Sequence, residues 1–208
     1  WQWDLWDHLC QSTNPSLSNY VSSIVDNPHM LNINYLNNKT DWVHMNGVDY
    51  NEELDQIALS SHFLNEMWVI DHSLSKEDTR KNTGGKYGVG GGFLYRWGNP
   101  ATYGASGQTI FKVMHDAHWV PKGRPRAGYL AGVNNQGVSN NQTAVDYFKP
   151  NWDGTQYVRT QGTAYQPATY EFRHAASGYT SNMGSCQELP NGNLLVCLAT
   201  AAKVYEVD

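Results

Sequence analysis

Asp41-Trp-Val-His-Met-Asn-Gly-Val-Asp-Tyr50 is the stretch that decides the fold of this chain. Successive side chains of a strand point to opposite faces, so His44 and Asn46 share one face of this segment. A second histidine segment, Met114-His-Asp-Ala-His-Trp119, also leads into a strand followed by a turn. Two strand starts that each carry imidazoles predict a repeated fold whose repeats meet at one polar site.

The composition favours an all-β globular protein. Of the 208 residues, 40% are hydrophobic and only 16% are charged, with eight Trp and thirteen Tyr. Good helix formers are scarce, and the abundant Asn and Gly break helices, so strands and tight turns are favoured. The net charge of -5 lacks the basic excess that nucleic-acid binding requires. No apolar run reaches the roughly 18 residues that a membrane-spanning helix needs, so no membrane span is predicted.

The three cysteines leave two interpretations open. If Asn191-Gly192 forms a two-residue turn, Cys186 and Cys197 fall directly opposite each other, and a cross-strand disulfide is geometrically conceivable. The alternative is two small buried thiols in a sheet. Cys10 has no partner in either interpretation.

Two features bear on the cellular compartment. The chain starts at Trp1 without an initiator methionine or a signal peptide, which is typical of a processed product or of a piece of a longer protein. Asn38-Lys-Thr40 and Asn141-Gln-Thr143 match the acceptor pattern for N-glycosylation, which applies in a eukaryotic secretory pathway. An exported protein, periplasmic or extracellular, is the favoured interpretation.

Short strands separated by turn residues recur along the chain. Residues 1–9 are predicted to form one strand, with a short helix as the alternative, and residues 10–40 to form a long loop of the kind that is often functional. Residues 41–100 and 111–175 each offer four short strands bounded by turn residues, and residues 180–208 offer three.

Repeats of about 70 residues with four antiparallel strands each are typical of β-propeller blades with long inserts. Residues 1–9 then supply the outer strand of a preceding blade, and residues 180–208 an incomplete blade. Because radial packing needs a closed ring of about four blades or more, we expect about three blades of a longer protein. A stacked β-sandwich is the alternative fold.

The most specific motif lies in residues 42–61. Trp42-Val-His-Met-Asn-Gly-Val48 leads into a strand that ends in Ser60-Ser61. This motif resembles the bacterial arylsulfate sulfotransferase family, whose members carry Trp-x-His-x-Asn-Ser-Val ahead of a strand ending in Ser-Ser. The resemblance covers nearly the whole chain, and three further segments share it: Leu94-Tyr-Arg-Trp-Gly-Asn-Pro100, His115-Asp-Ala-His-Trp119 and Leu189-Pro-Asn-Gly-Asn-Leu194.

The resemblance implies an exported, six-bladed β-propeller with a site in its central channel. In that family a histidine accepts a sulfuryl group from an aryl sulfate and passes it to a phenol, without a nucleotide donor or other cofactor. Matched by position, His44 corresponds to the first channel histidine and His115 to the second. The turn Val133-Asn-Asn-Gln-Gly-Val138 lacks the expected arginine, and Thr180-Ser-Asn-Met-Gly184 lacks the expected nucleophilic histidine. A non-catalytic binding or scaffold module is therefore the alternative function.

Sulfuryl transfer needs an imidazole nucleophile and hydrogen-bonding groups around the sulfuryl oxygens. Neutral imidazole is abundant near pH 7, and a carboxylate such as Asp116 can orient its second nitrogen. The ligand is expected to be an aromatic or sulfated small molecule, and assembly as a homo-oligomer is left open. The predicted catalytic residues are His44, His115 and His118, and the predicted substrate-binding residues are Asn46, His62 and Asn134.

No metal or nucleotide site is predicted. In a regular strand His115 and His118 lie on opposite faces, so they are not placed to coordinate the same zinc ion. The glycine run from Gly84 to Gly92 lacks the Lys-Ser/Thr ending of a phosphate-binding loop. Arg96, in the Tyr-Arg-Trp-Gly segment, is expected to be a buried ion-pair or stacking residue.

Overall fold

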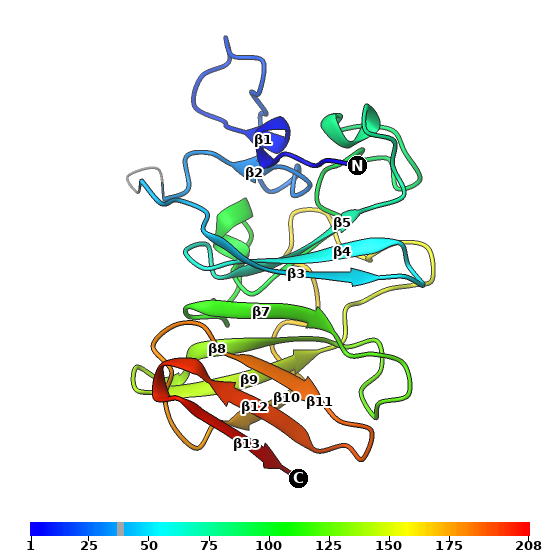
Figure 1. The fold of residues 1–208 in the computed structure, drawn as a ribbon. Coiled ribbons are helices and arrows are strands. Elements are labelled where there is room, and N and C mark those ends of the chain that lie inside the picture. The colour runs from blue at the N-terminus through cyan, green and yellow to red at the C-terminus, as the bar shows by residue number, and fades with distance from the viewer. Residues whose placement is uncertain (37–39) are drawn as a thin grey trace.

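The computed structural model describes residues 1–36 and 40–208, which fold into short strands with four 3-10 helices in that part of the chain (Figure 1). None of these helices is long and apolar enough to cross a membrane. The glycosylation motif at Asn38 falls outside the described residues. The motif at Asn141 lies in an exposed turn between two strands of the second sheet.

Three antiparallel meanders follow one another along the chain, each with its strands in sequence order. The numbers of strands agree with the four, four and three predicted for residues 41–100, 111–175 and 180–208. The first sheet contains β3 (Met45–Asn51), β4 (Gln56–Ser61), β5 (Glu66–Asp71) and β6 (Tyr95–Trp97). The second contains β7 (Met114–Trp119), β8 (Leu130–Ser139), β9 (Gln142–Phe148) and β10 (Phe172–Ala175). The third contains β11 (Ser185–Glu188), β12 (Leu194–Leu198) and β13 (Lys203–Val207).

The first strands of the three sheets, β3, β7 and β11, lie next to one another. β7 runs between β3 and its own partner β8, and β11 contacts both β7 and β8 (Figure 1). The sheets are not closed into a barrel. This arrangement brings together the segments that carry the predicted histidines.

The N-terminal segment does not form the outer strand predicted over residues 1–9. Leu5–His8 is a 3-10 helix, η1, and β1 (Leu9–Cys10) pairs with β2 (Leu31–Asn32) in parallel. The Trp3 indole N–H donates to the Gly91 carbonyl at 2.6 Å, and the Trp3 ring stacks on His8. The alternation of aromatic and polar residues thus reflects packing onto the glycine-rich loop instead of a sheet. Three further short helices are η2 (Asp78–Arg80), η3 (Pro100–Tyr103) and η4 (Ala199–Ala201).

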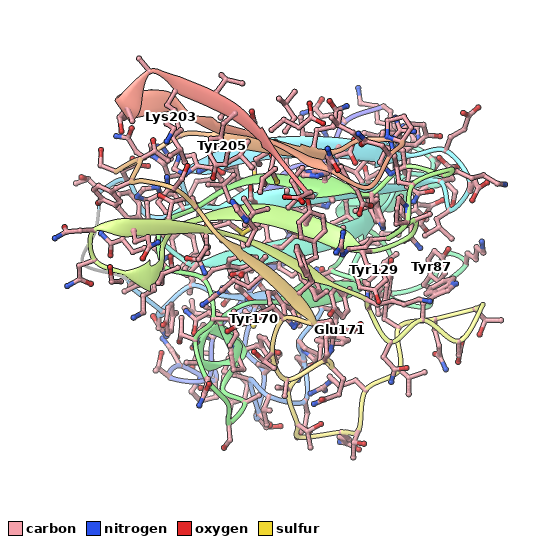
Figure 2. The ribbon with its side chains drawn as sticks, turned by 90° about the horizontal axis from the view of Figure 1, so that it is seen from below. Tyr87, Tyr129, Tyr170, Glu171, Lys203 and Tyr205 are labelled. Atoms are coloured by element: carbon pink, nitrogen blue, oxygen red, sulfur yellow. The ribbon has the colours of Figure 1, made fainter. Side chains whose placement is uncertain are left out.

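Aromatic packing joins the first two sheets. Trp97 of β6 stacks on Phe148 of β9 with ring centroids 3.7 Å apart and an interplanar angle of 13°, and Phe111 meets Trp97 edge to face. Each such buried ring removes enough apolar surface from water to contribute about 1.5–3 kcal/mol. Figure 2 shows the molecule from below and labels Tyr129 and Glu171, whose side chains join the residue before β8 to the residue before β10 because the Tyr129 hydroxyl donates to Glu171 at 2.8 Å.

A fully buried ion pair holds the outer edge of the first sheet. Arg96 and Glu66 are both 0% exposed, and the Arg96 Nη2 lies 2.6 Å from Glu66 Oε2. All five guanidinium N–H groups donate, two of them to Glu66 and the others to Thr102 and the carbonyls of Pro28 and Met30. The guanidinium also lies over the Tyr103 ring, 4.8 Å from its centroid. The expectation of a buried ion-pair and stacking residue is confirmed.

The disulfide interpretation is wrong, and all three cysteines are free thiols. Gly192, with φ +91°, donates to the Leu189 carbonyl, and the Leu189 N–H donates to Asn193. This loop has three residues and a glycine bulge, not two residues. The extra residue shifts the register by one, so Cys186 pairs with Val196 and its side chain points away from the face that carries Cys197.

Removal of one partner from the buried ion pair should destabilise the fold strongly. Arg96→Met leaves the Glu66 carboxylate buried without its counter-charge, and we expect a loss of about 3–5 kcal/mol in the free energy of unfolding. Lys122→Met is the control, because Lys122 and Glu53 form an exposed pair and the change should leave stability nearly unmoved. Urea unfolding of both variants measures the difference, and equal small effects would contradict the assigned role of Arg96.

The buried His8 should make the fold sensitive to mild acid. Burial lowers the pKa of His8, although its hydrogen bond to Asn82 acts in the opposite direction. The unfolded chain therefore binds more protons than the folded one as the pH falls below about 6.5, so folding stability drops in that range and is fully present above it. His8→Gln removes this titration. The variant should lose less unfolding free energy than the parent between about pH 7.5 and pH 5.5, and identical losses would count against the buried neutral imidazole.

Candidate active site

A cleft of about 610 Å³ lies where the first strands of the three sheets meet. Its walls come from the start of β3, from β7 and from the two residues that precede β11. The side chains at its mouth and walls include three histidines and two carboxylates: His44, Asn46, Asp49, His115, Asp116, His118 and Met183. The cleft thus collects His44, His115 and His118, the residues predicted to be catalytic, together with Asn46.

His44 is the most accessible imidazole of this group. It directly precedes β3 in a left-handed backbone conformation, φ +49°, and its side chain is 45% exposed. Its Nδ1 hydrogen-bonds to the Asp41 carboxylate. In the part of the chain that the structure describes, residues 1–36 and 40–208, Asp41 is the residue that hydrogen-bonds to the His44 ring. A carboxylate on Nδ1 fixes the proton there and leaves the lone pair on Nε2, as nucleophilic and metal-binding imidazoles require.

His115 is held at both ring nitrogens. Its Nδ1 lies 2.8 Å from Asn135 Oδ1, and its Nε2 accepts the Met183 N–H at 3.1 Å. Burial lowers the pKa of His115, against the opposing effect of the Asn135 hydrogen bond. A neutral ring with a proton on Nδ1 satisfies both contacts. His115 therefore fastens the start of β11 to β7 and offers no vacant nitrogen in this arrangement.

Asn135 is a site residue that the sequence analysis missed. Its side-chain amide donates to the carbonyls of Thr180 and Met183, both at 2.8 Å, while its oxygen orients His115. The predicted substrate-binding residue was its neighbour Asn134. Asn134 is fully buried and donates to Asp146 at 2.8 Å, away from the histidines. In a strand only one of two adjacent residues faces the site, and the Asn-Asn pair gave no signal as to which one.

A bulge in β7 places His115 and His118 on the same face. His115 pairs with Val133 and His118 pairs with Ala131, so three steps along β7 match two steps along β8. Val133 and Ala131 are two apart on a regular strand and share a face, which their partners therefore share. The prediction that the two histidines lie on opposite faces was wrong because Asp116, with φ +62°, adds a residue to the strand.

His118 interacts mainly with Asp116. Its Nδ1 lies 3.0 Å from the Asp116 carbonyl oxygen and 3.4 Å from the carboxylate Oδ2. Burial acts to lower the pKa of His118, but the hydrogen bond and charge of Asp116, together with the charge of Asp49, outweigh it and the pKa is raised. His118 is thus electrostatically distinct from His115, three residues earlier.

His62 has its ring close to those of both His44 and His115. Its ring centroid is 5.0 Å from that of His44 and 5.4 Å from that of His115. Its main-chain N–H donates to the His44 carbonyl at 3.1 Å. The structure therefore brings this predicted substrate-binding residue to the cleft histidines.

The segment before β11 brings Met183 and Gly184 to the cleft, although the resemblance predicted a histidine within Thr180–Gly184. Met183 lies two residues before β11 with φ +56°, and His44 lies one residue before β3 with φ +49°, so both adopt left-handed backbone just ahead of the first strand of their sheets. No arginine within residues 1–36 and 40–208 lines the cleft. Arg159, the first arginine after the 133–138 turn, donates instead to the Thr163 and Val25 carbonyls.

Side chains of each first strand bind the main chain of the next one. Asn46 donates to the Met114 carbonyl at 2.7 Å, and Asp49 accepts the Trp119 N–H at 2.8 Å. Asp116 accepts the Cys186 N–H at 2.8 Å in the same way between β7 and β11. Asn46 is thus committed to the wall of the cleft, and Asp49 is a wall residue that the sequence analysis did not single out.

Gly47 should prove essential for the close approach of β3 and β7. A Cβ added there would lie 2.4 Å from Ser60 Oγ and 3.0 Å from the Ala117 nitrogen. We expect Gly47→Ala to cost about 1–3 kcal/mol of unfolding free energy through overpacking. Gly178→Ala is the matched control, because its Cβ would meet one flexible Leu198 methyl at 3.1 Å. Thermal unfolding compares the two, and a Gly47→Ala variant as stable as its control would contradict the tight interface.

Comparison with known proteins gives the family. The family model described as Arylsulfotransferase (ASST) matches residues 1–206, which is nearly the entire chain. No curated protein matches the chain. The match extends over all three sheets and the N-terminal segment, so it does not rest on the histidine motif alone. The chain belongs to the arylsulfotransferase (ASST) family.

Proposed function

We propose that the cleft transfers a sulfuryl group from an aryl sulfate to a phenolic acceptor, with His44 as the residue that carries the group. Family membership supports the reaction class. The single observation that favours His44 is its hydrogen bond to Asp41 on the rim of the cleft. No nucleotide or other cofactor is part of the proposal.

The proposed chemistry has two displacements at sulfur. The lone pair on His44 Nε2 attacks the sulfur, an N–S bond forms, and the bond between sulfur and the aryl oxygen breaks as the phenolate leaves with its electron pair. The acceptor oxygen then attacks the same sulfur, the N–S bond breaks, and the phenolic proton passes to solvent. Asp41 holds the Nδ1 proton and stabilises the positive charge that the ring gains in the intermediate.

The residues around His44 have two proposed roles: one contacts the sulfuryl group, and the others hold the cleft in shape. His62 lies beside His44 and is the residue that we place against the sulfuryl oxygens. His115 acts through position, because its two nitrogens fix the start of β11. His118 and Asn46 form the wall of the cleft. We do not extend a substrate-binding role to Asn134, whose amide is used within the second sheet.

The arrangement of the sheets supports a β-propeller. Three consecutive antiparallel meanders whose first strands lie together are what adjacent blades around a channel provide. On this proposal residues 41–100 and 111–175 are blades and residues 180–208 belong to a third. Export, an aromatic or sulfated ligand and assembly as a homo-oligomer stay predictions that accompany the family assignment.

A binding module without turnover is the second candidate. No histidine stands within Thr180–Gly184, and the Nε2 of His115 is occupied by the Met183 N–H. A chain that had lost its nucleophile would still offer the cleft to a sulfated or aromatic ligand. Activity measurements separate the two candidates.

The activity test uses a chromogenic aryl sulfate and a phenol acceptor. We expect acceptor-dependent release of the chromophore by the full-length protein, and a loss of at least about 10³-fold in kcat/KM for His44→Asn. Asp41→Asn should lose about 10–10³-fold, because the ring keeps its place but not its tautomer. The sulfuryl-enzyme intermediate should be trapped by quenching at alkaline pH and located on the His44 peptide by mass spectrometry.

His72→Asn is the control for this test. His72 is a partly exposed histidine paired with Asp55 outside the cleft, so activity should stay within about twofold of the parent. Full activity of His44→Asn would place the nucleophile elsewhere. A folded parent protein that binds the aryl sulfate and never turns it over would favour the binding module.

A further inference from the structure

A second cluster of reactive side chains lies on the wall of the cleft, between β7 and β11. Asp116, His118 and Cys186 each offer a ligand atom, and these carboxylate, imidazole and thiol atoms all lie within 4.8 Å of one another. Two of the residues come from the second sheet and the third from the third sheet. Their convergence is therefore a product of the fold, and the sequence spacing gives no hint of it.

The geometry of the cluster follows from contacts already fixed by the main chain. The bulge in β7 turns Asp116 and His118 toward β11, and the Cys186 N–H donates to Asp116 Oδ2 at 2.8 Å. Asp116 Oδ2 also lies 3.4 Å from His118 Nδ1. In a tetrahedral zinc site, bond lengths of about 2.0–2.3 Å put ligand atoms roughly 3.3–3.8 Å apart. The cluster is within a small side-chain movement of that spacing.

An independent feature of the same place is a buried hydroxyl. Tyr147 of β9 is 0% exposed, and its hydroxyl interacts with the Cys186 thiol. The Cys186 thiol thus has polar neighbours in both Tyr147 and Asp116. The cleft on the other side of Asp116 and His118 leaves room for a further ligand or for water.

We propose that Asp116, His118 and Cys186 form a binding site for a divalent metal ion, and that the ion is Zn²⁺. One thiolate, one imidazole and one carboxylate are a ligand set that suits a borderline-soft ion and does not suit Mg²⁺ or Ca²⁺. Three protein ligands with an open side on the cleft leave a fourth position for water or a ligand oxygen. The competing account is purely structural, with Asp116 bonded to His118, to the Cys186 thiol and to the main chain in the absence of any ion.

Cobalt spectroscopy on the full chain distinguishes the two accounts. The protein is freed of metal with a chelator and titrated with Co²⁺. We expect one Co²⁺ per chain, with a thiolate-to-cobalt charge-transfer band in the near ultraviolet and visible bands of tetrahedral intensity, all bleached by one equivalent of Zn²⁺. Cys186→Ser should abolish the charge-transfer band, and His118→Asn should weaken binding by about 100-fold or more.

The chain offers matched controls. Cys10→Ser and Cys197→Ser alter thiols outside the cluster and should leave the spectrum unchanged. His44→Asn should also keep the charge-transfer band, so that failure of the metal site and failure of the sulfotransferase proposal are separate outcomes. If Cys186→Ser does not fold, as judged by circular dichroism, His118→Asn and Asp116→Asn decide the matter. Absence of the band in the folded parent, or its survival in Cys186→Ser, would overturn the proposal.

Discussion

The polar side chains that reach from one first strand to the main chain of the next are the constraint on which the site depends. Asn46 and Asp49 bind β7, and Asp116 binds β11. A hydrogen bond to a charged group contributes about 1.5–3 kcal/mol, and loss of one would strand a polar group at the interface. These hydrogen bonds fix the position of each sheet against the next, which the apolar clusters alone would not do. The close approach requires Gly47, where a side chain would collide with Ser60 and Ala117.

Irregular backbone is concentrated where the side chains of the cleft are placed. The register shifts between Met45 and Gly47 in β3 and between His115 and His118 in β7. His44, Asp116 and Met183 adopt left-handed conformations that non-glycine residues seldom take. Bulges and unusual dihedrals of this kind re-aim side chains and are tolerated where the surroundings fix them. Here the cross-strand hydrogen bonds provide that fixing, so the strand irregularity and the sheet contacts depend on each other.

The periodic part of the sequence predicted the periodic part of the structure. The strands over residues 45–207 follow from alternation and turn residues, and the motif around His44 leads into the first strand of the first sheet. The periodic pattern could not predict where a single extra residue is added to a loop or strand. One extra residue in the Leu189–Asn193 loop separates Cys186 from Cys197, and one in β7 reunites His115 with His118. A shift of one residue moves every later side chain of the strand to the opposite face of the sheet, and the local composition does not reveal such a shift. The strand predicted for the N-terminal segment was wrong for another reason, because the alternating aromatic residues of that segment pack on a loop.

The same hydrogen-bond geometry decides which imidazole can act as a nucleophile. A ring bonded at both nitrogens, such as His115, could attack only after it released the Met183 N–H, at the cost of a hydrogen bond that contributes about 0.5–1.5 kcal/mol. His44 carries no such obligation, since Asp41 engages Nδ1 and the ring stands half-exposed on the rim. A carboxylate on one nitrogen fixes the proton there and leaves the lone pair of the other nitrogen for attack on sulfur. Of His44 and His115, the residue that the sequence motif emphasised is therefore the one whose Nε2 the hydrogen bonds leave available, which supports the role proposed for His44.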